Sequence, residues 1–291
     1  IMKDPLGPDP WFEELEDPST WSSVRIIVPL WRFYLLVDTE QWDEILTSFD
    51  TLTGVDQTLL YRIAAVHALE HASSSSQAGV VAKQALAGLI EFGQLGVVSS
   101  IIDKYGSGAL KQGGFIANYI EGDIAYRKVR EIFKSDVPAE DRSIQNEFSE
   151  IASIFDKAIR ADDVGAYPAL VDDCQFMLGL ALFYSSQFES AAEAFQGASQ
   201  GDNKKQATWM AIVSLNYIDT LTQEELEVKD ALSTVYIDTW PNTKHANQLI
   251  LQRSEKGLFD SNTVEDLLSI SHSDPLYEDA QRQAARSLYQ M

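Results

Sequence analysis

The segment from His67 to His71 carries the residues of this chain whose types and spacing best suit catalysis, because it reads His-x-x-Glu-His. Two histidines four residues apart share one face of a helix and could bind a zinc ion, with Glu70 as the general base. The third ligand would then be a distant carboxylate such as Glu147 or Glu150. One function that the sequence allows is therefore that of a zinc hydrolase.

The residues around this motif favour a structural role instead. Both histidines lie in the middle of an apolar stripe, on the helix face that is expected to pack against a neighbouring helix. The stripe consists of Leu60, Ile63, Ala64, His67, Ala68 and His71. The segment also lacks the strands that surround this pattern in zinc peptidases. We therefore expect the chain to hold no zinc, to use no cofactor and to have no catalytic residues.

The other groups of chemical interest also have simpler structural explanations. Cys174 is the only cysteine, so it can form no internal disulfide, and its place within a predicted helix favours a small buried side chain. Gly106 and Gly108 lack the third glycine of a dinucleotide fingerprint, and Lys111 is not followed by the Ser or Thr of a phosphate loop. We therefore expect no nucleotide site.

Helical spacing of apolar residues fills the chain after residue 18, and no stretch shows sustained alternation of apolar and polar residues. Thr222 and Glu225 form a capping box, Gly257 sits past a helix end, and Asp274 followed by Pro275 opens the last helix. The fold class is thus predicted to be all-α. The expected helices lie near residues 20–37, 40–50, 57–73, 77–92, 95–104, 114–134, 143–161, 168–185, 188–199, 205–219, 223–239, 243–256, 262–270 and 275–289.

The segment from Cys174 to Ser199 resembles one repeat of the tetratricopeptide family. Leu178 and Gly179 fill its adjacent Leu-Gly positions, and Ala191 with Phe195 fills the small and aromatic positions of the second helix. Gly179 lets the backbone of a neighbouring helix come close, while the small and large residues form a pair that packs on the first helix.

The resemblance extends, more weakly, over residues 114–255. One 34-residue period later a degenerate unit contains Trp209, and an upstream unit begins near Gly122 and Tyr126. The segment from Trp240 to Ala246 resembles the aromatic-Pro junction of bacterial envelope proteins of this repeat class, which favours the periplasm or envelope over the cytoplasm. The resemblance implies a right-handed α-solenoid of degenerate tetratricopeptide-like helix pairs, whose usual function is to hold another polypeptide.

In this repeat class the inner groove is lined by the first helix of each pair. The resemblance therefore implies a partner-binding face that mixes aromatic and acidic side chains, which suits a peptide with apolar and basic residues. The alternative is that several of these side chains pack against a neighbouring helix or against the N-terminal arm. The residues are Asp173, Phe176, Leu180 and Phe183, then Met210, Ser214 and Tyr217, and upstream Tyr119, Asp123 and Tyr126.

The charge of the chain narrows the class of partner. With 44 acidic against 22 basic residues, the net charge is −22, which opposes binding to nucleic acid and to anionic membranes. A protein or peptide with basic segments is favoured, although the charge could instead keep the protein soluble in a saline habitat. The apolar stretch at residues 24–37 is too short to cross a bilayer and contains two arginines and a proline, and the stretch at residues 85–102 is broken by Glu91, Gln94 and three glycines. Both read as buried helices, so we expect no membrane insertion within residues 1–291.

Three regions follow from these patterns. Residues 1–18 form an acidic, Pro-rich N-terminal arm, residues 19–104 an N-terminal helical region, and residues 114–291 the tetratricopeptide-like repeats. The glycine-dense stretch at residues 105–114 separates the last two. The chain begins Ile-Met with no signal-peptide pattern after it, so we expect a trimmed or mature form.

The sequence thus favours a non-catalytic scaffold for protein–protein interaction. Besides the zinc hydrolase, the alternative is a helical protein that binds a small ligand or glycan. A closed pocket lined by tryptophans would support that alternative. The tryptophans are Trp11, Trp21, Trp31, Trp42, Trp209 and Trp240.

Overall fold

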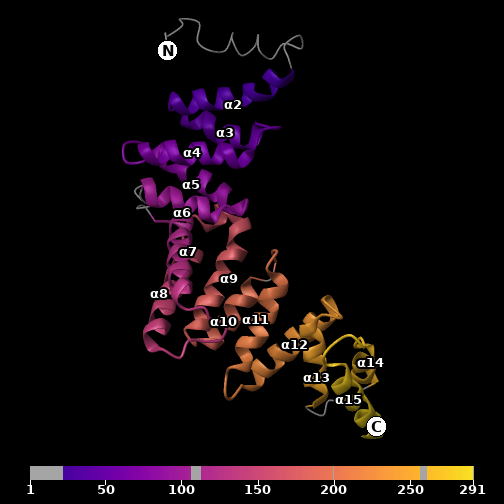
Figure 1. The fold of residues 1–291 in the computed structure, drawn as a ribbon. Coiled ribbons are helices and arrows are strands. Elements are labelled where there is room, and N and C mark those ends of the chain that lie inside the picture. The colour runs from indigo at the N-terminus through magenta and orange to yellow at the C-terminus, as the bar shows by residue number, and fades with distance from the viewer. Residues whose placement is uncertain (1–21, 106–112, 199, 256–260, 291) are drawn as a thin grey trace, which may run out of the picture. The chain divides into compact units, whose positions relative to one another are not determined.

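The computed structural model describes residues 22–105, 113–198, 200–255 and 261–290, and these residues form α-helices, one 3₁₀ turn and no strand (Figure 1). The all-α prediction is confirmed, and each helix matches one predicted range. The largest difference is at Asn216, where a helix predicted to reach residue 219 ends. The helices are α2 (Ser22–Asp38), α3 (Trp42–Thr51), α4 (Gln57–His71), α5 (Ser76–Glu91), α6 (Leu95–Tyr105), α7 (Phe115–Ile132), α8 (Arg142–Ile159), α9 (Pro168–Tyr184), α10 (Phe188–Gly197), α11 (Lys204–Asn216), α12 (Gln223–Thr239), α13 (Lys244–Glu255), α14 (Ser261–Ser269) and α15 (Tyr277–Gln290).

Local signals at helix ends explain several of these bounds. The capping box before α12 is confirmed, since the Thr222 hydroxyl accepts from the Glu225 amide and the Glu225 carboxylate accepts from the Thr222 amide. The last helix begins at Tyr277, two residues later than predicted, because the Asp274 carboxylate accepts from the Leu276 amide in a turn before the helix. The predicted acidic arm and Gly257 lie outside the described residues.

The chain forms two compact units, which we call the first unit and the second unit. The first contains the described residues up to Ala125 together with Lys157–Leu170, and the second contains Tyr126–Asp156 and the described residues from Val171 onward.

None of the helices among the described residues combines the length and apolar character that a bilayer crossing requires.

In the first unit, each helix packs on helices one or two positions away in sequence. Helix α2 packs on α3 and α4, α4 packs on α5, and α6 packs on both α4 and α5. Helices α4 and α5 come close where Gly88 faces the ring of Tyr61, since a Cβ at Gly88 would lie 2.5 Å from that ring. At the other end of this unit, the Phe115 amide donates to the Asp163 carboxylate (2.6 Å), which ties the start of α7 to the 3₁₀ turn at Val164–Ala166.

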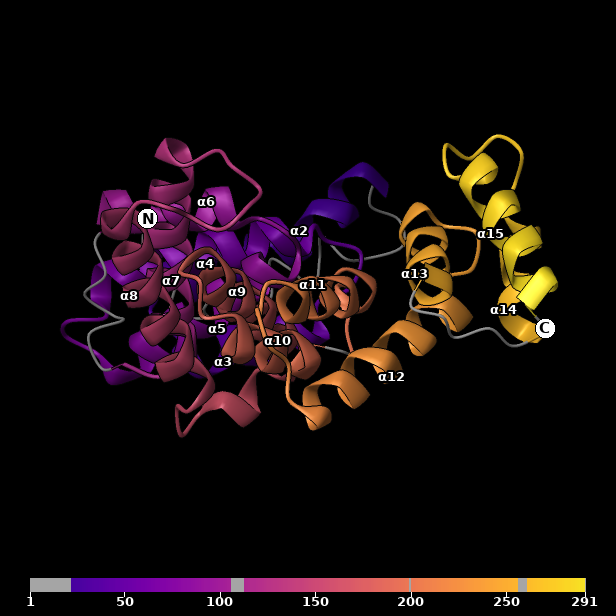
Figure 2. The ribbon, with the colours of Figure 1, turned by 90° about the horizontal axis from the view of Figure 1, so that it is seen from below.

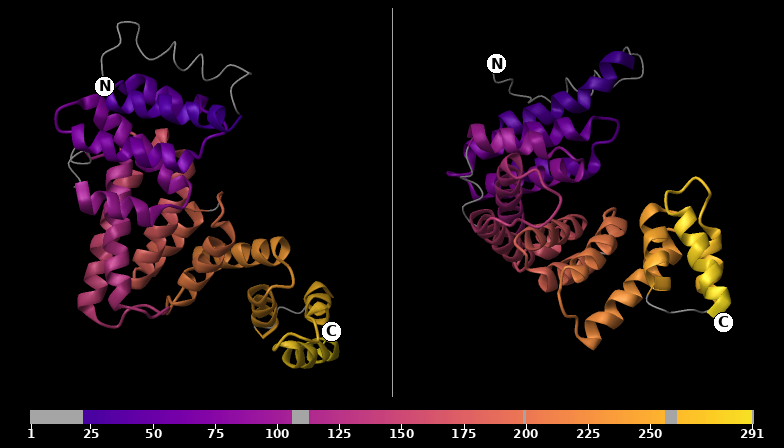
Figure 3. Two further views of the ribbon diagram at one scale, coloured as in Figure 1. Left: turned by 45° about the horizontal axis from the view of Figure 1, so that its top comes forward. Right: turned by 60° about the horizontal axis from the view of Figure 1, so that its bottom comes forward.

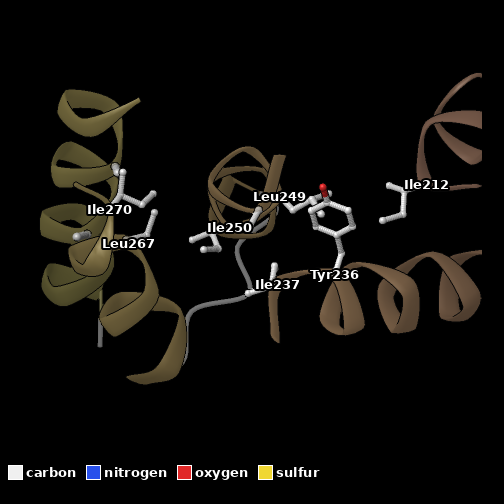
Figure 4. Packing of buried hydrophobic residues seen from close by; sticks show 10 residues of the cluster. Ile212, Tyr236, Ile237, Leu249, Ile250, Leu267 and Ile270 are labelled. Carbon is white, nitrogen blue, oxygen red and sulfur yellow. The ribbon is translucent and has the colours of Figure 1, made fainter. Parts of the chain in front are cut away.

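The second unit also consists of helices that pack on those one or two positions away in sequence. Helix α10 packs on α11 and α11 on α12 (Figure 2), and α13, α14 and α15 pack on one another, as both views of Figure 3 show. One apolar cluster continues through α11 to α15 (Figure 4). Packing of successive helices in neighbouring pairs is the arrangement expected of a solenoid-like all-α protein. The cluster consists of Ile212, Tyr236, Ile237, Ala246, Leu249, Ile250, Leu267, Ile270, Ala280 and Ala284.

Gly179 makes a close contact in the second unit, but with a side chain of the neighbouring helix and not, as the sequence had predicted, with its backbone. A Cβ at Gly179 would lie 2.6 Å from the ring of Phe195, so the space that glycine leaves is filled by a side chain rather than by backbone. Phe195 and Ala191 are both fully buried. The small and large residues therefore pack on the first helix of the pair as their spacing predicts.

Candidate protein-binding surface

The His-x-x-Glu-His motif lies at the end of α4, where His71 makes local contacts. Its Nδ1 lies 2.9 Å from the His67 carbonyl oxygen, its Nε2 lies 3.5 Å from Glu40 Oε1, and its ring lies 5.8 Å from the Trp42 ring. Both histidines are half-buried, at the edge of the apolar stripe rather than in its middle. Nowhere in the described ranges do three His, Cys, Asp or Glu side chains gather so that they could hold a metal ion.

Half of the residues expected on the groove are enclosed by the protein itself. Phe176 packs against Phe195 with ring centroids 5.6 Å apart, and Tyr119 stacks on Phe115 at 5.9 Å. A partner would not reach these side chains, so they do not belong to the candidate surface. The enclosed residues are Tyr119, Asp123, Phe176, Phe183 and Ser214.

Tyr217 is the groove residue most open to solvent, with an exposed fraction of 41%. Its ring stacks on Phe188 with centroids 5.1 Å apart, and meets the buried ring of Phe183 edge-on at 5.4 Å. Tyr217 directly follows α11, and its ring contacts rings from two other helices, Phe183 of α9 and Phe188 of α10. Tyr217 is therefore an exposed aromatic ring with restricted motion.

The remaining groove residues are partly accessible. Leu180 of α9 and Met210 of α11 are half-buried. Tyr126 is half-buried as well, and its ring meets the Phe148 ring edge-on with centroids 5.9 Å apart. Leu180 and Met210 can add apolar contact area on α9 and α11 of the second unit.

Acidic residues gather near the starts of α9 and α11, whereas Phe183 and Tyr217 lie at the ends of these helices. Asp173 accepts a hydrogen bond from the Asn203 side-chain amide (2.6 Å). Burial raises the pKa of the Asp173 carboxyl above its usual value, and the charges of Asp172 and Asp202 raise it further, while the bond from Asn203 acts against them. Gly201 leaves room for the neighbouring Asp172 carboxyl, since a Cβ at Gly201 would lie 2.8 Å from Asp172 Oδ2. The mutual repulsion of these carboxylates favours a cation beside them.

Helix geometry fixes the distance between the acidic and aromatic ends. Asp173 and Phe183 are ten residues apart in α9, which at the rise of an α-helix is about 15 Å. Leu180 lies between them, close to two turns after Asp173 and so on the same face. We call this set the α9–α11 surface: Asp172, Asp173, Leu180, Phe188, Asp202, Met210 and Tyr217.

Sequence reasoning missed Phe188, which belongs to this surface, and Asn203, which donates a hydrogen bond to Asp173 of the surface. Phe188 and Asn203 stand at the starts of α10 and α11, and the repeat pattern gives these positions no binding role. The signal that could have identified Phe188 is its position five residues after Phe183, across the short turn between two predicted helices. Asn203 carried no such signal.

Two of the cavities on the described part of the protein have well-defined walls. One, of about 280 Å³, lies between α4 and α6 of the first unit, and the other, of about 320 Å³, lies among α10, α11 and α12 of the second. No tryptophan lines either of them. The tryptophan-lined pocket that a glycan-binding protein would need is thus not one of these two.

Comparisons of the chain with protein-family models, with curated proteins and with solved structures found no match in any of the three.

Proposed function

We propose that the protein is a tetratricopeptide-like scaffold that binds an extended segment of a protein partner on the α9–α11 surface. The observation that carries this proposal is Tyr217, an exposed aromatic ring held in place by Phe183 and Phe188. Rigid aromatic side chains are the anchors that dominate binding energy in protein interfaces, because little conformational freedom is lost when they are covered.

The acidic end of the surface selects the charge of the bound segment. A Lys or Arg placed beside Asp172, Asp173 and Asp202 would relieve the repulsion that raises the pKa of Asp173. The net charge of −22 attracts the same kind of partner from a distance. Such binding needs neither a metal nor a cofactor.

The separation of the two ends predicts the spacing of the partner's anchors. An extended chain covers about 3.3 to 3.6 Å per residue, so about 15 Å corresponds to roughly four to five residues. The bound segment should therefore carry a basic residue and an aromatic or large aliphatic residue at that spacing.

Synthetic peptides test this proposal directly. A fluorescently labelled Ser-Gly peptide with one Lys and one Trp at the expected spacing should bind more tightly than peptides with adjacent Lys and Trp, as measured by fluorescence anisotropy. Tyr217→Ala should weaken the binding of the correctly spaced peptide by about tenfold, the effect of removing an interface anchor. The melting temperature should change little.

The chain offers a matched control at Tyr289, another exposed tyrosine of the second unit, in α15. Tyr289→Ala should leave peptide binding unchanged. Equal affinity for all spacings, or equal loss in the two variants, would show that the α9–α11 surface is not the binding site.

A further inference from the structure

The first unit holds a cavity whose walls combine apolar side chains with positive charge. It has a volume of about 280 Å³ and lies between α4, which contributes Arg62 and Val66, and α6. Val97, Ile101 and Lys104 follow one another on α6 at helical spacing, so they face the cavity together. This volume is just below the range of about 300 to 1,000 Å³ that is typical of small-molecule sites.

Both charged residues of the cavity wall are cations, although acidic residues outnumber basic ones two to one in the chain, with 44 against 22. Arg62 makes no hydrogen bond or ion pair with another residue in the described ranges. Lys104 Nζ lies 4.8 Å from the centroid of the Tyr105 ring, and its pKa is raised first by a hydrogen bond to Tyr105 and then by the charges of Tyr105 and Glu70. Lysine and arginine together offer up to eight donor hydrogens, so this contact leaves donors for a ligand.

The other lining residues include apolar side chains and a glycine with open space beside it. Val66 and Val97 are half-buried and Ile101 is buried, while Tyr105 presents an aromatic ring beside Lys104. A Cβ at Gly96 would meet no atom within 4 Å, so the space next to this lining residue is open. A ligand that suits these walls has an apolar part against the valines and an acidic group against the two cations.

We propose that the cavity between α4 and α6 binds a small organic carboxylate with an apolar or aromatic body. The Arg62 guanidinium presents paired donors that match the two oxygens of a carboxylate, and Lys104 adds a point charge. The site is independent of the α9–α11 surface, since all its residues belong to the first unit. Failure of the peptide proposal would leave this one unaffected, and the reverse also holds.

Three probes that differ in charge and in apolar body test the chemistry of the site. By isothermal titration calorimetry on the full chain, 3-phenylpropanoate should bind saturably, and its uncharged amide should bind at least tenfold more weakly. Inorganic phosphate, which has charge but no apolar body, should also bind more weakly than 3-phenylpropanoate. Equal binding of the acid and the amide, or tightest binding of phosphate, would overturn the proposal.

Gly96 allows the cavity to be filled without disturbing the fold. Gly96→Leu places a side chain in open space, so the variant should keep its melting temperature and lose 3-phenylpropanoate binding by tenfold or more. The control is Gly79→Leu on α5, where a Cβ also meets no atom within 4 Å. Gly79→Leu should bind the probe as the parent does.

A second variant keeps the test decisive if Gly96→Leu fails to fold. Arg62 is exposed, so Arg62→Gln removes the charge without opening a core cavity. Arg62→Gln should weaken binding of 3-phenylpropanoate about tenfold and leave binding of its amide unchanged. Unchanged affinity of the acid in Arg62→Gln would contradict the proposal.

Discussion

At the scale of single residues, the same device brings helices together in both units: an aromatic ring lies over a glycine. Phe195 covers Gly179 in the second unit, and Tyr61 covers Gly88 in the first. In the second unit the glycine is on the first helix of the pair and the ring on the second, and in the first unit the order is reversed. The device therefore does not depend on the tetratricopeptide pattern, which is weak in the first unit.

A double-mutant cycle at Gly179 and Phe195 should show that the two positions share one space. Gly179→Leu drives a side chain into the Phe195 ring and should cost about 1 to 3 kcal/mol, while Phe195→Ala leaves a cavity and should cost about 3 to 5 kcal/mol. Because the new leucine can occupy that cavity, the double variant should lose less than the sum. Urea unfolding measures the free energy of unfolding of all three variants. If the losses of the two single variants add up to that of the double variant, the two positions do not share one space.

Single residues also mark the limit of what the sequence could predict about the site. Repeat position indicates which helix a residue belongs to, but it does not show what covers its side chain. Phe176 and Phe183 belong to α9, which is apolar around most of its circumference, so neighbouring rings enclose both. Tyr217 stays exposed because it follows the last residue of α11, where fewer neighbours surround it.

At the scale of helices, the sequence predicted the all-α class and the approximate bounds of each described helix. Apolar spacing and end signals such as the Thr222–Glu225 capping box depend only on nearby residues, so they can be read without knowing the fold. The ring contacts between helices could not be read in this way. Trp209 of α11, Tyr236 of α12 and His245 of α13 meet in space although up to 36 residues separate them.

This meeting of three helices predicts a pH dependence of stability. His245 stacks on Trp209 with ring centroids 3.9 Å apart, and burial lowers its pKa below the ordinary value of 6.5, with Lys244 and Lys205 lowering it further. The unfolded chain therefore takes up the proton first as the pH falls. Stability that is complete above pH 6.5 should be lost progressively below that value.

The variant His245→Phe isolates this effect, because it keeps an aromatic ring for Trp209 but cannot titrate. Thermal melts between about pH 7.5 and about pH 5.5 should show a smaller decrease in melting temperature for the variant than for the parent. Parallel curves for the two proteins would show that His245 does not contribute to the pH dependence.

At the scale of the whole molecule, the net charge of −22 acts on folding and on binding in opposite ways. Repulsion among like charges destabilises the folded chain, whereas the same negative field favours a basic partner. Salt weakens both, since the screening length falls from about 30 Å at about 10 mM salt to about 8 Å at about 150 mM.

Raising NaCl over this range should therefore increase the melting temperature and weaken binding of the correctly spaced Lys-Trp peptide. Differential scanning calorimetry and fluorescence anisotropy measure the two effects on the same sample. Sucrose is the control, because it stabilises the folded chain without screening charge and should leave peptide affinity unchanged. A peptide affinity that does not change with salt would remove the electrostatic part of the proposed function.

Because the single native thiol of the chain is buried, a label for single-molecule measurements can be attached at a chosen second position. Cys174 is fully buried, its Sγ lies 3.8 Å from the Phe155 carbonyl oxygen, and burial raises its pKa far above that of a free thiol. It will therefore react slowly with maleimides while the protein is folded. A cysteine introduced at an exposed position such as Tyr289 would be the only fast-reacting thiol, so a dye or spin label can be attached there without first replacing the native cysteine.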